Sequence, residues 1–225
     1  MSTLSRYLKS KSNKIYILCC LFIIFLYLLT KNSSISMYEL VADPNEVGQL
    51  APYTGLVSTI GTLIFAATAS TCFFTAYIVG IEQKSIKWQM FLHFSGLFIL
   101  LLLADDLWQI HENIPVMLFG NLAQGAIQNI GEAVVFGFYG LLFFLYSFKF
   151  KTIILQTRLI PLLIAILFFA ASTIIDIFFT NVNGHFVLEE GFKLLGIVSF
   201  SMYYFEVCEK QIKQLLNIRN KQSDR

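Results

Sequence analysis

The sequence predicts an all-α integral membrane protein, built as a six-transmembrane-helix bundle with its N and C termini cytoplasmic. Three observations lead to this fold class. The 225 residues are 56% hydrophobic and only 13% charged, whereas soluble domains contain about 25% charged residues. Apolar runs close to the roughly 20 residues that a spanning helix needs recur along the chain. Basic residues gather in alternate connecting segments, as the positive-inside rule requires of a membrane protein.

We expect six spans, at about residues 15–30, 54–81, 88–110, 129–148, 159–180 and 185–208. Together they form one predicted transmembrane domain, residues 15–208, between an N-terminal segment 1–14 and a basic cytoplasmic tail 209–225. The first span is short, but the flanking Lys14 and Lys31 can extend their side chains to the membrane surface. A chain of this size cannot bury six such runs as internal helices of a soluble core.

The basic residues set the predicted orientation. Fourteen of the sixteen Lys and Arg residues precede span one, follow span six, or lie between spans two and three or four and five. Only Lys31 and Lys193 lie elsewhere. We therefore place the protein in the membrane as a multi-pass chain whose partner is the lipid bilayer. The net charge of +2 gives no indication of nucleic-acid binding, and the sequence does not identify a protein partner.

Carboxylic acids recur at one predicted depth in four of the helices. Each lies 17 or 18 residues from a charged residue at the inner boundary, which corresponds to about 25–27 Å of helix. The set is Asp105, Asp106, Glu132, Asp176, Glu189 and Glu190, with His111, Glu112 and His185 just above it and Lys193 one turn deeper. We expect these side chains to form a ring just inside the outer leaflet.

So many acids beside one lysine leave negative charge uncompensated, and unpaired charge at membrane depth costs several kcal/mol. Either some carboxyl groups are protonated or a cation lies among them. A divalent metal ion would suit carboxylates and imidazoles. Its candidate ligands are Asp105, Asp106, His111, Glu112, Glu132, Asp176 and His185. The simpler alternative is that each acid reaches interfacial water by itself.

The segments "DDLWQIHE" and "EEGFK" resemble a pattern in uncharacterised bacterial polytopic membrane proteins, with the acids and histidine of DD-L-x-x-x-H-E followed by E-E-x-x-K. This resemblance covers spans three to six and implies a location in the bacterial inner (cytoplasmic) membrane, but no known activity. The second segment alone also resembles the E-E-x-x-K motif of glutamic-type intramembrane proteases. That resemblance implies Glu189 and Glu190 as bases that activate water, with Lys193 as their partner.

Three functions remain open from the sequence. The first is a membrane-embedded hydrolase, metal-dependent or glutamic-type, that acts on a lipid or membrane peptide with Glu189, Glu190 and Lys193 as catalytic residues. The second is a proton- or cation-coupled transporter, or a cation-binding protein. The absence of further acids below the ring in spans three to five argues against a continuous transport path. The third is a structural subunit whose polar residues only fix helix packing.

Overall fold

The computed structural model describes residues 11–31, 36, 38, 44–82, 85–120, 126–179 and 182–223. Every regular element in these ranges is a helix, which confirms the all-α class. Some residues used in the sequence predictions lie outside the described ranges: Arg6, Lys9, Lys84, Thr180 and Arg225. The chain divides into two compact units, and the boundary between them in the sequence lies between Thr54 and Gly55.

The first unit contains helices α2 (Lys11–Lys31) and α4 (Pro44–Val47). Helix α2 covers the first predicted span, and many of its apolar side chains, from Leu21 to Leu29, are exposed. Its described apolar part, Cys20–Lys31, is shorter than a full span. The first span therefore stays a prediction. The packing of all six spans into one bundle also stays a prediction.

The second unit contains four helices that are long and apolar enough to cross a membrane. They are α5 (Leu56–Glu82), α6 (Ile86–Trp108), α8 (Ala126–Lys149) and α10 (Ile160–Phe178). These four correspond to predicted spans two to five, and this supports the assignment of the chain as a membrane protein. The sixth predicted span lies within α11 (His185–Ser223), whose 39 residues include many charged side chains.

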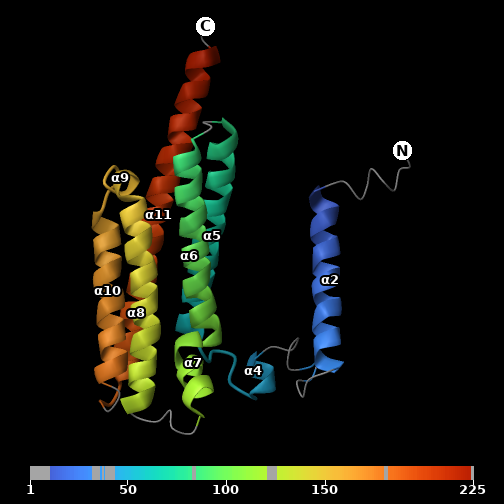
Figure 1. Cartoon of the computed structure of the whole chain (residues 1–225), viewed down its shortest axis with the longest axis vertical. Coiled ribbons are helices and arrows are strands. Elements are labelled where there is room, and N and C mark those ends of the chain that lie inside the picture. Colours follow the sequence, from blue (N-terminus) through green and yellow to red (C-terminus); the bar gives the residue numbers. More distant parts are fainter. Residues whose placement is uncertain are drawn as a thin grey trace. The chain divides into compact units, whose positions relative to one another are not determined.

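Helix α5 packs against both α6 and α11, and α10 packs along α11 (Figure 1). Their shared core is rich in aromatic rings: Tyr204 meets Phe200 edge to face, and Phe91 lies at a tilt to Tyr204. Glycines permit the close approach: an added Cβ at Gly96 would lie 2.8 Å from the ring of Phe73, and one at Gly196 would lie 2.8 Å from Phe169.

The third predicted span ends earlier than expected and is followed by a second helix. Gln109 adopts a left-handed conformation, with φ 48° and ψ 48°, and ends α6. Helix α7 (Ile110–Phe119) begins directly after it and packs against α8. Asp105 and Glu112 therefore lie on different helices. Pro115 of α7 lies against Gly131 of α8, where an added Cβ would be only 2.5 Å from the proline ring.

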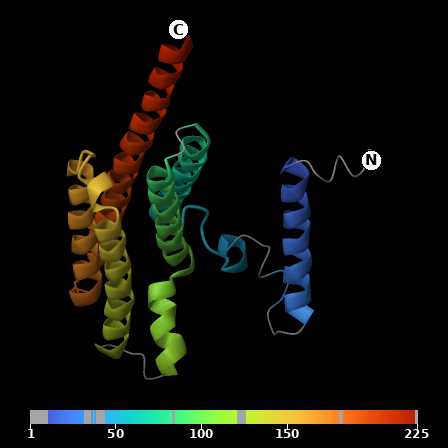
Figure 2. The ribbon, with the colours of Figure 1, turned by 45° about the horizontal axis from the view of Figure 1, so that its top comes forward.

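The C-terminal tail predicted as a separate segment continues α11 without a break as far as Ser223. Its last turns extend beyond the other helices of the unit (Figure 2). A short helix α9 (Lys151–Ile154) joins α8 to α10 at the same end. The described basic residues Lys87, Lys149, Lys151, Arg158, Lys210 and Lys213 all belong to this end.

The predicted acids lie at the opposite end of the same helices. Asp105 and Asp106 are in the last turn of α6, and Asp176 is in the last turn of α10. Glu189 is in the first turns of α11. This separation of basic and acidic ends agrees with the 17 or 18 residues that separate each acid from a charged residue at the inner boundary in the sequence. Which end faces the cytoplasm stays a prediction.

Candidate functional site

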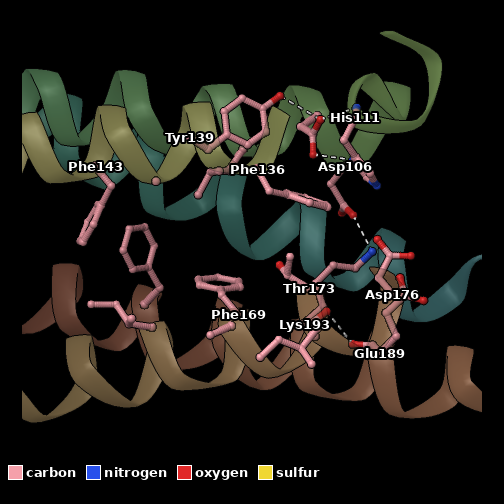
Figure 3. A pocket seen from close by; sticks show the side chains of 18 of the residues that line it. Asp106, His111, Phe136, Tyr139, Phe143, Phe169, Thr173, Asp176, Glu189 and Lys193 are labelled. Atoms are coloured by element: carbon pink, nitrogen blue, oxygen red, sulfur yellow. Dashed lines mark hydrogen bonds and ion pairs between the residues drawn. The ribbon is translucent and has the colours of Figure 1, made fainter. Parts of the chain in front are cut away.

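The acidic end of the second unit opens into a cavity of about 500 Å³ between α6, α8, α10 and α11. Its charged lining consists of Asp105, Asp106, His111, Asp176, Glu189 and Lys193. The remainder is mostly aromatic and aliphatic, with Phe98, Phe143, Phe169 and Phe200 deepest in the unit. Figure 3 shows the two parts: charged groups gather at one end, and the phenylalanine rings face the other. The cavity is therefore amphiphilic along its length.

The cavity is as deep as one leaflet of a bilayer. Along α10 its lining extends from Asp176 back to Ile166, a separation of ten residues that corresponds to about 15 Å of helix. A hydrocarbon core is about 30 Å thick. The apolar end of the cavity thus lies close to the middle of a membrane that the helices would span.

The cavity also reaches the outer surface of the unit along α8 and α10. Four of its lining residues are exposed: Gly140 of α8 and Ile166, Ala170 and Ile174 of α10. An added Cβ at Gly140 would meet no atom within 4 Å. A molecule in the surrounding membrane could therefore enter from the side, between α8 and α10.

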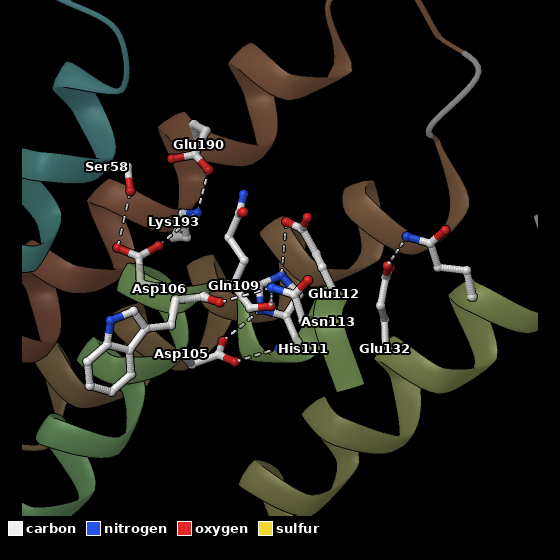
Figure 4. A network of polar contacts seen from close by, with 12 residues as sticks. Ser58, Asp105, Asp106, Gln109, His111, Glu112, Asn113, Glu132, Glu190 and Lys193 are labelled. Atoms are coloured by element: carbon white, nitrogen blue, oxygen red, sulfur yellow. Dashed lines mark hydrogen bonds and ion pairs between the residues drawn. The ribbon is translucent and has the colours of Figure 1, made fainter. Parts of the chain in front are cut away.

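Asp105 joins three helices at the charged end, and its contacts with His111 are drawn in Figure 4. Its Oδ1 accepts hydrogen bonds from the backbone N–H of His111, at 2.9 Å, and from the hydroxyl of Tyr139, at 2.9 Å. The Nδ1 of His111 donates to Oδ2 at 2.8 Å. The helix dipole disfavours an acid at the end of α6, but Asp105 also satisfies a free amide in the first turn of α7, where a carboxylate is favoured.

Asp106 is held by a different helix. Lys193 of α11 lies between two carboxylates, with its Nζ 3.1 Å from Asp106 Oδ1 and also hydrogen-bonded to Glu190 Oε1. Ser58 of α5 donates to Asp106 Oδ2 at 3.4 Å. The Asp106 side chain is only 8% exposed, so this network compensates a nearly buried charge. Of the three predicted catalytic residues, Glu189 and Lys193 line the cavity, and Glu190 does not.

Asp176 and Glu189 differ from the other two acids of the cavity. Within the described ranges, neither carboxyl group has a hydrogen bond or an ion pair, although both line the cavity. The hydrogen bond at Glu189 involves its backbone carbonyl, which accepts from Ser172 at 3.0 Å. These two carboxyl groups, one from α10 and one from α11, remain available to a bound molecule.

The other predicted ligands lie around the cavity without lining it. Glu132 is buried and accepts a hydrogen bond from Gln128 at 2.9 Å. Glu112 is exposed and lies 3.7 Å from His111 Nε2, and His185 donates from Nδ1 to the Val182 carbonyl at 2.9 Å. Across the described ranges, no three His, Cys, Asp or Glu side chains are grouped so that they could hold a metal ion. The metal ion therefore stays a prediction from the sequence.

Two hydrogen-bond donors of the site were not predicted as site residues, Ser58 and Tyr139. Tyr139 follows Glu132 by seven residues, which is two helical turns, so it lies on the same face of α8. This spacing is the feature of the sequence from which Tyr139 could have been predicted as a site residue. For Ser58 the sequence contains no signal that distinguishes it from the other hydroxyl side chains of α5.

His111 lies in α7, outside the candidate spans, and its pKa is raised. Burial alone lowers the pKa of this imidazole because the charged form loses hydration, but the hydrogen bond and the negative charge of Asp105 outweigh burial. Glu112 and Asp176 act in the same direction. The imidazolium form is thus favoured beside Asp105.

Comparison with known proteins gives a family without an activity. Residues 15–207 match the family described as Domain of unknown function (DUF8692), and the chain belongs to that family because the match covers most of its length. No curated protein and no solved structure matches the chain significantly. An uncharacterised membrane family was expected from the sequence, and the match agrees with this in general terms.

The Lys193 network yields a prediction for stability. Replacement of Lys193 by Met leaves the buried Asp106 without its cation, and we expect a loss of about 3–5 kcal/mol in the free energy of unfolding. The double variant Lys193→Met/Asp106→Asn should recover most of this loss. Unfolding of the detergent-solubilised protein by a denaturing detergent measures the difference.

Lys213→Met is the matched control on the same helix, because Lys213 pairs with Glu209 at an exposed position and such pairs contribute at most about 1 kcal/mol. Equal effects of Lys193→Met and Lys213→Met would contradict the compensating role of Lys193.

The raised pKa of His111 predicts a pH dependence of stability. A group that binds its proton more tightly in the folded state stabilises that state fully below its unfolded pKa, near 6.5, and loses this contribution as the pH rises through the folded pKa. We therefore expect wild-type stability to fall across this interval relative to His111→Gln. Parallel unfolding curves over the same pH range measure the difference, and identical pH profiles of the two proteins would disprove the prediction.

Proposed function

We propose that this protein binds a membrane amphiphile, with the hydrocarbon chain in the aromatic part of the cavity and the headgroup among the charged side chains. The observation that carries this proposal is the change of the lining from charged to apolar over the depth of about one leaflet. A cavity of about 500 Å³ falls within the range of roughly 300–1,000 Å³ that ligand sites occupy.

The side opening supports the same occupant. Lipids approach a membrane protein laterally, and the exposed lining residues of α8 and α10 face that direction. With the orientation predicted from the basic residues, the headgroup would lie in the outer leaflet of the inner membrane. The proposal therefore includes a lipid-facing portal between α8 and α10.

A transporter has less support than a binding site. Polar groups do occur deeper in the unit, where Ser95, Tyr146 and Tyr204 form a hydrogen-bonded cluster. The rings of Phe98 and Phe143, which line the cavity, pack against Tyr146 and separate this cluster from the charged end. A purely structural role for the ion pairs would not require the adjoining cavity.

A large side chain in the portal between α8 and α10 should prevent the hydrocarbon chain of the amphiphile from entering the cavity. We expect Gly140→Leu to abolish labelling of Phe65 and Phe200 by a phospholipid that has an ethanolamine headgroup, which ends in an ammonium group, and a photoreactive diazirine in its acyl chain. These two side chains are only 3% and 2% exposed, yet both line the cavity, so they can react only with a chain inside it. Peptide mass spectrometry of the reconstituted protein locates the labelled residues.

Gly137→Leu is the matched control. It lies one turn earlier on α8, has the same open space around an added Cβ and does not line the cavity, so labelling should persist. Wild-type labelling confined to exposed residues would contradict the proposal.

A second candidate, hydrolysis of the bound amphiphile, is favoured by the position of Glu189. Its carboxyl group lines the cavity and has no donor among the described side chains, so it can accept a proton from water. The water oxygen would then bond to a carbonyl carbon of the amphiphile, and the proton would pass to the leaving group as the bond between that group and the carbon breaks.

If Glu189 is the general base, Glu189→Gln should lower the rate of hydrolysis by about 10²–10⁴-fold. Release of nitrophenolate from the nitrophenyl ester of tetradecanoic acid measures the rate in detergent. Glu209→Gln, a matched change on α11 at a residue that does not line the cavity, should leave the rate unchanged. A wild-type rate equal to the detergent background, or an active Glu189→Gln variant, would exclude this candidate and would not affect the binding proposal.

A further inference from the structure

We propose that the amphiphile bound in this cavity carries a cationic headgroup, such as a protonated amine. This inference rests on the proposed binding function and specifies the ligand class of the same site. It follows from which charges line the cavity and which of them already have partners.

The charged end of the cavity contains more acids than bases. Its lining includes four carboxyl groups but only two basic groups, Lys193 and His111. A further carboxyl group, that of Glu190, lies beside Lys193. The potential in a cleft of this kind favours cations and repels anions, and apolar walls strengthen the effect.

Both basic groups are already engaged. Lys193 contacts Asp106 and Glu190, and the imidazole of His111 donates to Asp105. An anionic headgroup, such as a phosphate, would have to compete with these carboxylates for either cation. Within the described lining of the cavity, no third basic side chain is available to it.

Asp176 and Glu189 offer the complementary arrangement. Their carboxyl groups reach the cavity from neighbouring helices and have no donor in the described part of the chain. An ammonium group has three N–H donors and no acceptor, which complements carboxyl groups that accept and have no donor. Hydrogen bonds between ionised groups are about twice as strong as those between neutral groups. A cationic headgroup would thus supply the charge that these two acids lack.

Three probes with the same hydrocarbon chain distinguish the possible headgroups. They are tetradecylamine, tetradecanol and tetradecyl phosphate. Each competes with the diazirine phospholipid for labelling of Phe200 in full-length protein in a neutral maltoside detergent. We expect the amine to compete at least about tenfold better than the alcohol, as charge-assisted hydrogen bonds predict, and the phosphate to compete least.

The double variant Asp176→Asn/Glu189→Gln should bind the amine and the alcohol equally well, because only the charge is removed. Glu112→Gln is the matched control, since this exposed acid lies at the same end of the unit without lining the cavity, and it should retain the preference for the amine. The single variants Asp176→Asn and Glu189→Gln should each reduce the preference, which provides the test if the double variant does not fold.

The outcomes distinguish this inference from the proposed function. If the phospholipid labels Phe200 and the alcohol or the phosphate competes as well as the amine, the binding function stands and the cationic headgroup is refuted. A preference for the amine that survives in the Asp176 and Glu189 variants also refutes it. If neither labelling nor competition occurs in the wild type, the binding function itself fails.

Discussion

The charged end of this protein depends on one carboxylate, that of Asp105. It accepts hydrogen bonds from the backbone and the imidazole of His111 in α7 and from the hydroxyl of Tyr139 in α8. These contacts require the chain to turn at Gln109, where the left-handed conformation ends α6. Helix α7 then packs on α8, with Pro115 against Gly131. Without this turn, His111 would follow the axis of α6 and leave Asp105 without its principal donors.

The second constraint is the scarcity of positive charge. Lys193 compensates Asp106 and Glu190 together, and His111 compensates Asp105. A buried carboxylate that loses its partner is strongly destabilising, so both bases are committed to the fold. The remaining acids of the cavity, Asp176 and Glu189, have no such role among the described contacts. Because both basic side chains are paired with Asp105, Asp106 and Glu190, none is left for Asp176 and Glu189, and these two acids are available to a ligand.

Helix lengths and the common depth of the acids could be predicted from the sequence, because a helix has a fixed rise per residue and a bilayer a nearly fixed thickness. The break at Gln109 could not, since a non-glycine residue in the left-handed region has no reliable sequence signal. The metal site was predicted because carboxylates and histidines share one level. That level alone does not reveal that Tyr139, His111, Ser58 and Lys193 direct their donors at Asp105 and Asp106. The cavity depends on packing between helices, which spacing along one helix does not reveal.

The glycines of the helices differ in what surrounds them. Small residues in membrane helices ordinarily permit close helix contacts, and Gly61, Gly96 and Gly196 do so here, since an added Cβ at each would lie within 3 Å of a side chain on a neighbouring helix. Gly140 lines the cavity, yet an added Cβ would meet nothing within 4 Å. Helix packing therefore does not account for a glycine at this position. Gly137 has the same open surroundings but does not line the cavity, so only at Gly140 does the missing side chain leave space at the exposed edge of the cavity, where the proposed amphiphile would enter.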